Sequence, residues 1–251
     1  MEIRKNRIKQ RLRDGKHVIA IENLNNPDLV EQFAPNDPHC FWFEGEHFIV
    51  NPSNIGHLTR AADLINATSI VRVPRPEYQL IYHALDLGAQ GVAVPHVKSK
   101  EDAELVVNAS KFSPIGQRGM FTSRQGIGID DYFHKANDET FVLVFIEDLI
   151  AIENLDEILE VENIDVFFVG PGDLSQELGH IGQQNHPEVK KVVQETINRI
   201  TNKGKIAGTV ANLSSYEWAM QTGAKFFLSG ALDWISEGYD EFIEIAQKLD
   251  K

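Results

Sequence analysis

Two acidic residues, Glu147 and Asp173, each follow a short apolar run that is typical of a buried strand. Glu147 follows FVLVFI, and Asp173 follows VFFVGPG. A carboxylate at the exit of a buried strand is not a natural core residue, and two of them on successive strands would lie side by side. Because neighbouring carboxylates repel each other and a divalent cation relieves that repulsion, the pair predicts a metal site. Oxygen ligands favour Mg²⁺ or Mn²⁺, and Co²⁺ and Zn²⁺ are further candidates.

Other polar residues also stand at strand exits. His47 follows two glutamates after the run at 41–43, and we interpret it as the group that transfers a proton. Arg72 ends an apolar strand, where a cation must be paired or face a cavity. We therefore expect Arg72 to stabilise negative charge that develops on a substrate oxygen. His96 follows the fourth strand, and we interpret it as structural, with a ligand contact as the alternative.

The residues beside Asp173 favour a substrate anion. Gly172 lets the backbone come close to a ligand, and the N–H groups there could hold a substrate carboxylate. No lysine stands at the carboxyl end of a strand, since the nearest, Lys98, lies four residues past Val94. This argues against Schiff-base chemistry.

The elements that position these residues alternate between strands and helices. Helical spacing of apolar residues occupies 54–65, 77–87 and 189–200. Eight strand–helix repeats favour a (β/α)8 barrel of the TIM type, in one domain over 1–251, because an open doubly wound sheet would carry a glycine-rich turn after its first strand. The expected strands are 18–21, 41–43, 70–73, 92–94, 141–146, 166–169, 206–210 and 226–228.

The longest segment without a clear strand is 113–138. We expect either a long loop that covers the active site or a surface excursion. A C-terminal helix at about 236–249 is a candidate for use in oligomerisation.

Composition excludes several classes of partner. The 37 acidic residues exceed the 24 basic ones, so the net charge is −13, which disfavours nucleic acid and anionic membranes as partners. The only cysteine is Cys40, which favours a reducing compartment. No apolar run suits a signal peptide or a membrane span, and we therefore expect a cytoplasmic protein.

Six motifs together resemble the HpcH/HpaI aldolase and citrate lyase family, and within it the metal-dependent aldolases that act on pyruvate-type 2-oxo acids. The resemblance runs in order from about residue 12 to residue 233. The motifs are FEGEH, VRVP, LDLGAQGVAVPHV, SPIGQRG, FIED and VGPGDLS.

The resemblance implies a (β/α)8 barrel, usually assembled as a hexamer, with a divalent metal on Glu147 and Asp173. A 2-oxo acid would chelate the metal, Arg72 would help to stabilise the enolate, and His47 would move the proton, oriented by Asp86. Asp86 ends the helix before the fourth strand and so lies toward the wrong end of its own barrel. We therefore predict that Asp86 meets a His47 from a neighbouring subunit.

The sequence also departs from the family pattern. Phe145 stands where the family usually has a glutamine, and Glu44 replaces an aspartate. We assign catalytic roles to Glu44, His47, Arg72 and Asp86, substrate contacts to Arg72, Phe145, Gly170, Pro171 and Gly172, and metal binding to Glu147 and Asp173.

The leading hypothesis is a class II aldolase that cleaves or forms 4-hydroxy-2-oxo acids from a 2-oxo acid and an aldehyde. The alternatives are a relative that decarboxylates oxaloacetate or forms citrate, and a catalytically idle protein that binds oxo acids.

Overall fold

Eight parallel strands close into a barrel in which neighbours in sequence are neighbours in space and β8 pairs with β1. The computed structural model describes residues 2–250. The strands are β1 (Val18–Glu22), β2 (Cys40–Glu44), β3 (Thr68–Arg72), β4 (Gly91–Val94), β5 (Phe141–Ile146), β6 (Val166–Val169), β7 (Ala207–Val210) and β8 (Phe226–Gly230). Each expected strand is confirmed within two residues, and so is the expected (β/α)8 fold.

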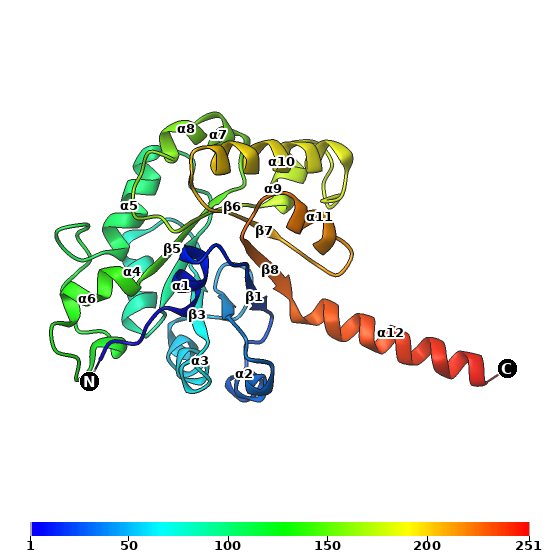
Figure 1. Ribbon diagram of the computed structural model, residues 1–251, viewed down its shortest axis with the longest axis horizontal. Coiled ribbons are helices and arrows are strands. Elements are labelled where there is room, and N and C mark those ends of the chain that lie inside the picture. The colour runs from blue at the N-terminus through cyan, green and yellow to red at the C-terminus, as the bar shows by residue number, and fades with distance from the viewer. Residues whose placement is uncertain (1, 251) are drawn as a thin grey trace.

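Helices surround the barrel (Figure 1). They are α1 (Arg7–Arg13), α2 (Pro27–Gln32), α3 (Pro52–Leu64), α4 (Tyr78–Asp86), α5 (Lys100–Ser110), α6 (Tyr132–Glu139), α7 (Leu149–Glu153), α8 (Leu155–Ile158), α9 (Pro171–Glu177), α10 (Pro187–Asn202), α11 (Tyr216–Gln221) and α12 (Ala231–Leu249). The three helices expected from apolar spacing appear as α3, α4 and α10, with ends within two residues of the prediction. Two short 3₁₀ helices lie at Ala34–Asn36 and Arg124–Gly126.

The core has two layers because alternate residues of each strand face opposite sides of the sheet. In β5, Phe141, Leu143 and Phe145 face the barrel interior, and the residues between them pack against the surrounding helices. Ile8 and Leu12 of α1 join the interior cluster and close the amino-terminal end of the barrel.

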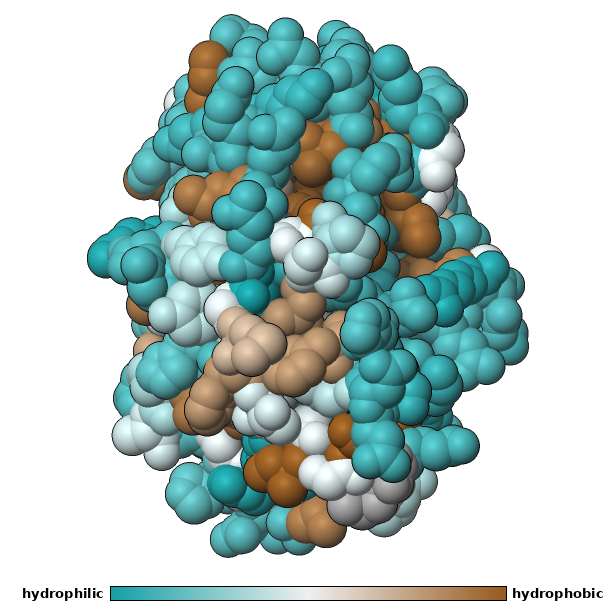
Figure 2. Space-filling view, turned by 90° about the vertical axis from the view of Figure 1, so that its left-hand side faces the viewer, coloured by the Kyte–Doolittle hydropathy of each residue, from teal (hydrophilic) through white to brown (hydrophobic). Residues whose placement is uncertain are grey.

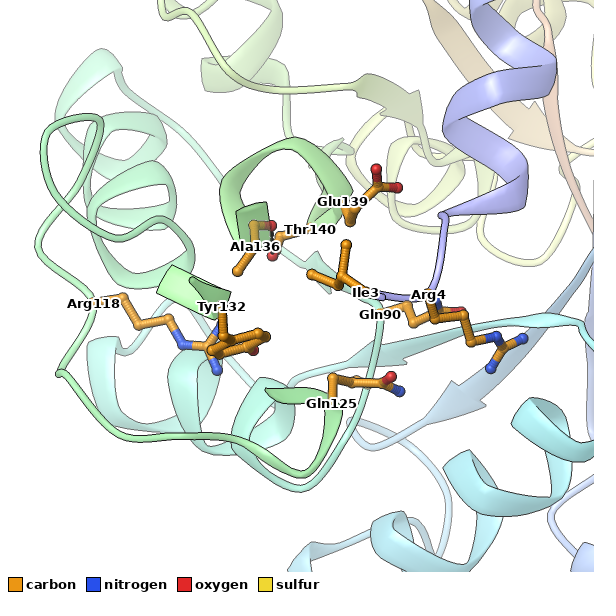
Figure 3. Close-up of a pocket in the computed structure, with 10 residues that line it drawn as sticks. Ile3, Arg4, Gln90, Arg118, Gln125, Tyr132, Ala136, Glu139 and Thr140 are labelled. Atoms are coloured by element: carbon orange, nitrogen blue, oxygen red, sulfur yellow. Dashed lines mark hydrogen bonds between the residues drawn. The ribbon is translucent and has the colours of Figure 1, made fainter. Parts of the chain in front are cut away.

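The segment 113–138 does not cover the active site of its own barrel. It follows α5 rather than β4, and Arg118 and Arg124 bind Asp86 and Asp63, which stand in the last turns of α4 and α3. Because helices of this fold end where the next strand begins, the segment lies at the amino-terminal end of the barrel. Of the two alternatives for this segment, a cover over the active site of its own barrel is therefore wrong, and the surface excursion is what the structure shows. Figure 3 shows Arg118 and Tyr132 beside a small cavity at this end.

The last helix leaves the barrel. α12 projects away from the other elements instead of packing over β8 and β1 (Figure 1). Of its residues only Ala231 is buried. No helix within residues 2–250 combines the length and the apolar character that crossing a membrane requires.

Candidate active site

The polar residues at the top of the barrel interior continue the inward-facing rows of the strands. Trp42 faces inward on β2, Ile70 on β3 and Phe145 on β5. The next residue of the same parity along each strand is Glu44, Arg72 and Glu147, respectively. Strand pairing places Glu44 directly beside Arg72. These three side chains therefore form one layer at the carboxyl end of the barrel, where enzymes of this architecture carry out their chemistry.

Glu44 organises the turn after β2. Its Oε1 accepts hydrogen bonds from the backbone N–H groups of Glu46 (2.7 Å) and His47 (3.2 Å), and its Oε2 accepts one from Trp42 Nε1 (3.1 Å). Gly45 is required within this turn because a Cβ there would lie 2.5 Å from the carbonyl oxygen of Arg72. The hydrogen bonds of Glu44 are thus used to shape the turn.

Arg72 lies among three carboxylates. Its Nη2 is 2.5 Å from Glu46 Oε2 and 3.5 Å from Glu147 Oε2, and its Nη1 is 3.5 Å from Glu44 Oε2. The guanidinium carbon lies 4.2 Å from the centre of the Phe145 ring, a cation–π contact that holds it from below. Arg72 Nε is buried without a hydrogen-bond partner among the described residues, so it can donate to a bound acceptor.

Glu147 is only 2% exposed. Its Oε1 accepts a hydrogen bond from the backbone N–H of His96 at 3.0 Å. His96 adopts φ +51°, a conformation that is uncommon for residues other than glycine, and its Nδ1 lies 3.1 Å from Asp148 Oδ2. Lys98 pairs with the other oxygen of Asp148 at 2.9 Å. The turn after β4 therefore holds both acidic residues that follow β5.

Asp173 lies in the first turn of α9, directly after β6. One ligand atom each from His96, Glu147 and Asp173 lie within 4.8 Å of one another, so the three side chains could hold one ion. Gly170 leaves room for this arrangement, because a Cβ there would lie 2.9 Å from Glu147 Oε2. The expected neighbourhood of Glu147 and Asp173 is present.

The electrostatics of this layer are those of an acidic site with too few cations. Burial raises the pKa of Glu147 to about 7, against the opposing effect of Arg72. Burial and the nearby charge of Glu44 raise the pKa of Glu22, at the end of β1, to about 7. Burial lowers the pKa of His96, but Asp148 and Glu147 outweigh it and raise the value overall. A divalent cation would stabilise the ionised carboxylates, so the residues fit a metal.

Two predicted residues lie outside this cluster. The His47 side chain is 63% exposed, and its ring contacts Glu46 at 3.6 Å. Asp86 ends α4, and its Oδ1 accepts a hydrogen bond from Arg118 Nη2 at 2.6 Å. Within one chain these two residues do not meet, and the predicted contact between neighbouring subunits stays a prediction.

Three further polar residues contribute to the site: Glu22, Glu46 and Asp148. His96, for which the sequence favours a structural role, belongs with them. The alternation of inward-facing residues along β1 could have found Glu22, because Ala20 and Val18 face inward two and four residues earlier, respectively. The position of His96 has no such signal, because it depends on the turn after β4.

Comparisons with known proteins agree with this architecture. The model of the family described as HpcH/HpaI aldolase/citrate lyase matches residues 22–242. A 2-keto-3-deoxy-L-rhamnonate aldolase from Salmonella gallinarum is 35% identical over 212 residues, which cover 82% of this chain and 79% of that protein.

Solved structures are similar over nearly the whole chain. An HpcH/HpaI aldolase from Desulfitobacterium hafniense is 28% identical, with a TM-score of 0.83 and 96% of each chain covered. An HpcH/HpaI aldolase/citrate lyase family protein from Burkholderia cenocepacia is 25% identical, with a TM-score of 0.90 over 97% of this chain and 100% of that one. The citrate synthase SbnG is 27% identical, with a TM-score of 0.86 over 98% of this chain and 100% of that one.

Proposed function

Since the chain belongs to the HpcH/HpaI aldolase/citrate lyase family and is a class II aldolase, we propose that it cleaves a 4-hydroxy-2-oxo acid into pyruvate or a related 2-oxo acid and an aldehyde. The observation that supports this most is the pair formed by buried Glu147 and half-buried Asp173, with Arg72 3.5 Å from Glu147. The aldolase from Salmonella gallinarum is named for a 2-keto-3-deoxy sugar acid, which has the same 2-oxo acid head.

Glu147 and Asp173 would hold the metal, with Mg²⁺ or Mn²⁺ as the preferred ions. When bound, a divalent cation polarises a 2-oxo acid and stabilises the negative charge that develops as the C–C bond breaks. Arg72 would donate to the same developing oxyanion, for which its unpartnered Nε is available. Phe145 keeps the guanidinium in place from below. Gly170, Pro171 and Gly172 would receive the substrate carboxylate at the start of α9.

We assign the proton transfer to His47, with Asp86 of a neighbouring subunit as the residue that orients it. The exposure of His47 in one chain supports a site that is completed by assembly. Replacing His47 with Gln should slow exchange of the pyruvate methyl protons with solvent by about 10²–10⁴-fold and leave metal affinity nearly unchanged. Full exchange activity in this variant would show that the role is assigned wrongly.

Incubation with Mn²⁺, pyruvate and a set of aldehydes tests the proposal. We expect aldol products, and deuterium incorporation into the methyl group of pyruvate when no aldehyde is added. Binding of metal and pyruvate without any exchange would instead support a catalytically idle oxo-acid-binding protein.

A second candidate function is the formation of citrate or the decarboxylation of oxaloacetate. The similarity to the citrate synthase SbnG favours it. Phe145, whose ring contacts Arg72, also motivates it, because the family usually has a glutamine at this position. Oxaloacetate with Mn²⁺, with and without an acetyl thioester, distinguishes the two candidates. If the protein turns over oxaloacetate but forms no aldol product from pyruvate and the aldehydes, this second candidate function is favoured.

The chain would act as a homo-oligomer, with a hexamer as the expected form. α12 carries an exposed apolar stripe at helical spacing, including Ile235, Tyr239 and Phe242. The barrel has an apolar cavity of about 250 Å³ where a packed last helix would lie, lined by Ile19, Ala211, Leu213, Tyr216, Met220, Phe227 and Trp234 among others. We assign this cavity to α12 of a second copy.

A further apolar surface supports assembly on another side. The segment 113–128 exposes Ile115, Met120, Phe121 and Ile127. Figure 2 shows apolar patches among hydrophilic residues on the side of the molecule where this segment lies. Exposed patches of this kind mark interaction surfaces.

Phe242→Glu tests the role of α12, and Glu237→Lys on the same helix is its matched control. We expect the Phe242 variant alone to dissociate in analytical ultracentrifugation. An unchanged oligomer would exclude α12 as the contact. The single cysteine, Cys40, is buried as a free thiol, which supports a reducing, cytoplasmic location.

A further inference from the structure

A second cluster of metal-ligand side chains lies outside the active site, in the segment that joins α9 to α10. It consists of His180, His186 and Glu188, and one ligand atom from each lies within 4.8 Å of the others. His180 Nε2 is 2.8 Å from Glu188 Oε2. The two imidazole rings are stacked, with centroids 3.5 Å apart. Two imidazoles and one carboxylate are a donor set that Zn²⁺ binds in proteins.

The backbone brings these side chains together. The N–H of His180 donates to Ser175 O (2.7 Å), that of Gln183 donates to His180 O (2.8 Å), and that of His186 donates to Gln183 O (2.9 Å). Gly179 and Gly182 adopt φ +79° and +74°, which allows the two successive turns. The two histidines are half-buried rather than fully solvated. The donors therefore lie on a hydrogen-bonded segment with little freedom to separate.

The chemistry of this cluster differs from that of the active site. Glu147 and Asp173 offer only oxygen and favour hard cations, whereas imidazole nitrogen favours Zn²⁺ and related transition metals. A tetrahedral ion with bonds of about 2.0–2.1 Å needs donors about 3.3 Å apart, which side-chain rotation can reach from the present separations. His186 also caps α10, because its Nδ1 accepts a hydrogen bond from Glu188 N at 3.3 Å. Metal binding through His186 Nδ1 would have to displace this long hydrogen bond.

We propose that His180, His186 and Glu188 form a second metal site, selective for Zn²⁺ or a similar transition metal over Mg²⁺. Three protein ligands leave at least one position for water. The site adjoins the catalytic layer along the chain, since α9 carries Asp173 in its first turn and ends just before His180. The same segment places Gln184 Nε2 close to Gly172, 3.7 Å from the point where a Cβ added to that glycine would lie. A bound ion would therefore hold the segment that flanks Asp173.

The test uses the untagged full chain with Glu147→Gln and Asp173→Asn, so that the catalytic pair no longer binds metal. We expect calorimetry and elemental analysis to find one Zn²⁺ per chain and no Mg²⁺ in this double variant. Adding His180→Ala should weaken Zn²⁺ binding by about 100-fold or more, beyond the loss seen for a residue that only supports a ligand. Co²⁺ bound at the site should lose its absorption bands in the same variant.

Two further variants keep the test clear of folding defects. His186→Asn removes the imidazole but retains a residue that caps helices well, so it should lose Zn²⁺ while α10 stays folded. His134→Ala changes an exposed histidine that is 78% accessible and should bind Zn²⁺ as before. Absence of Zn²⁺ from the double variant, or binding that His180→Ala and His186→Asn leave unchanged, would overturn the proposal. Either result would leave the proposed aldolase chemistry untouched, because that is measured with Mn²⁺ on the unmodified enzyme.

Discussion

The two ends of the barrel treat charge in opposite ways. At the amino-terminal end, each of these acids contacts at least one base: Asp165 pairs with Lys9 at 2.7 Å, Asp86 pairs with Arg118 at 2.6 Å, and Asp63 pairs with both Arg4 and Arg124. Arg4 and Arg118 border the small cavity at that end (Figure 3). At the carboxyl end, Arg72 alone is shared by Glu44, Glu46 and Glu147.

The difference separates residues that hold the fold from residues that perform chemistry. Matched buried charges stabilise the closed end, because removing one partner would leave the other uncompensated. The excess of carboxylates at the open end destabilises the metal-free protein and gives a cation its binding energy. Enzymes commonly retain such unfavourable groups where function needs them.

The largest expected effect comes from removing one carboxylate at the open end. Glu147→Gln should lower Mn²⁺-dependent turnover by more than about 10³-fold. This exceeds the effect of removing one hydrogen-bond donor to an oxyanion, because the variant loses a metal ligand. The same variant should be more stable than the parent without metal, because a buried carboxylate that has its pKa raised to about 7 is gone. Steady-state kinetics and thermal unfolding in EDTA measure the two effects. A variant that is inactive and also less stable would contradict the comparison.

Arg72→Lys tests the single shared cation. Lysine cannot reach three carboxylates from one planar group, so we expect kcat to fall by about 10²-fold. Metal affinity should change little, because Glu147 and Asp173 remain. Calorimetry with Mn²⁺ separates this outcome from a general collapse of the site, in which binding would be lost together with turnover.

At the closed end, Asp165→Asn should act on stability alone. Lys9 is 8% exposed and would lose its only charged partner among the described residues, keeping the Thr140 carbonyl as an acceptor, so the free energy of unfolding should fall by about 3 kcal/mol. The matched control is Asp156→Asn, whose pair with Arg199 is exposed and contributes about 0–1 kcal/mol. Denaturant titration measures both variants, and kcat of the folded fraction should equal that of the parent. A large drop in kcat would contradict the view that charged residues at the closed end serve stability and not catalysis.

The remaining predictions concern the pH dependence of stability. The folded-state pKa of Glu147, about 7, exceeds the ordinary value of 4.5, so the folded state binds more protons between these values. Without metal, stability should fall by about 3 kcal/mol as the pH rises from about 4.5 to 7. Mn²⁺ should remove most of this slope, because it stabilises the ionised carboxylate.

Lys111 at the closed end gives the opposite sign. Burial and the nearby charge of Lys9 lower its pKa from 10.5 to about 7, so the unfolded state binds more protons between these values. Its contribution to stability should therefore rise as the pH increases from about 7 to 10.5. Lys111→Met should abolish this rise in urea titrations, and Lys190→Met, on the surface helix α10, should retain it.

Much of the site could be predicted from the chain because strand parity is a local property. Once β5 is recognised, the inward row that ends in Phe145 places Glu147 in the barrel mouth, and the same rule places Arg72 on β3. The pairing of Glu147 with Asp173 follows from the order of parallel strands. Local spacing and strand order therefore suffice for the acidic pair.

The sequence by itself determined the barrel, its eight strands and the carboxylates at their exits, because short continuous apolar runs mark strands that are buried on both faces and a 3.6-residue period marks the helices that cover them. Only the tertiary structure decided that the segment 113–138 turns to the closed end, that His96 joins the metal pair, that His180 meets His186, and that α12 leaves its own barrel. Each of these depends on contacts between segments far apart in the chain or on the path of a turn. No local pattern encodes such contacts, since their energies arise only when the elements meet.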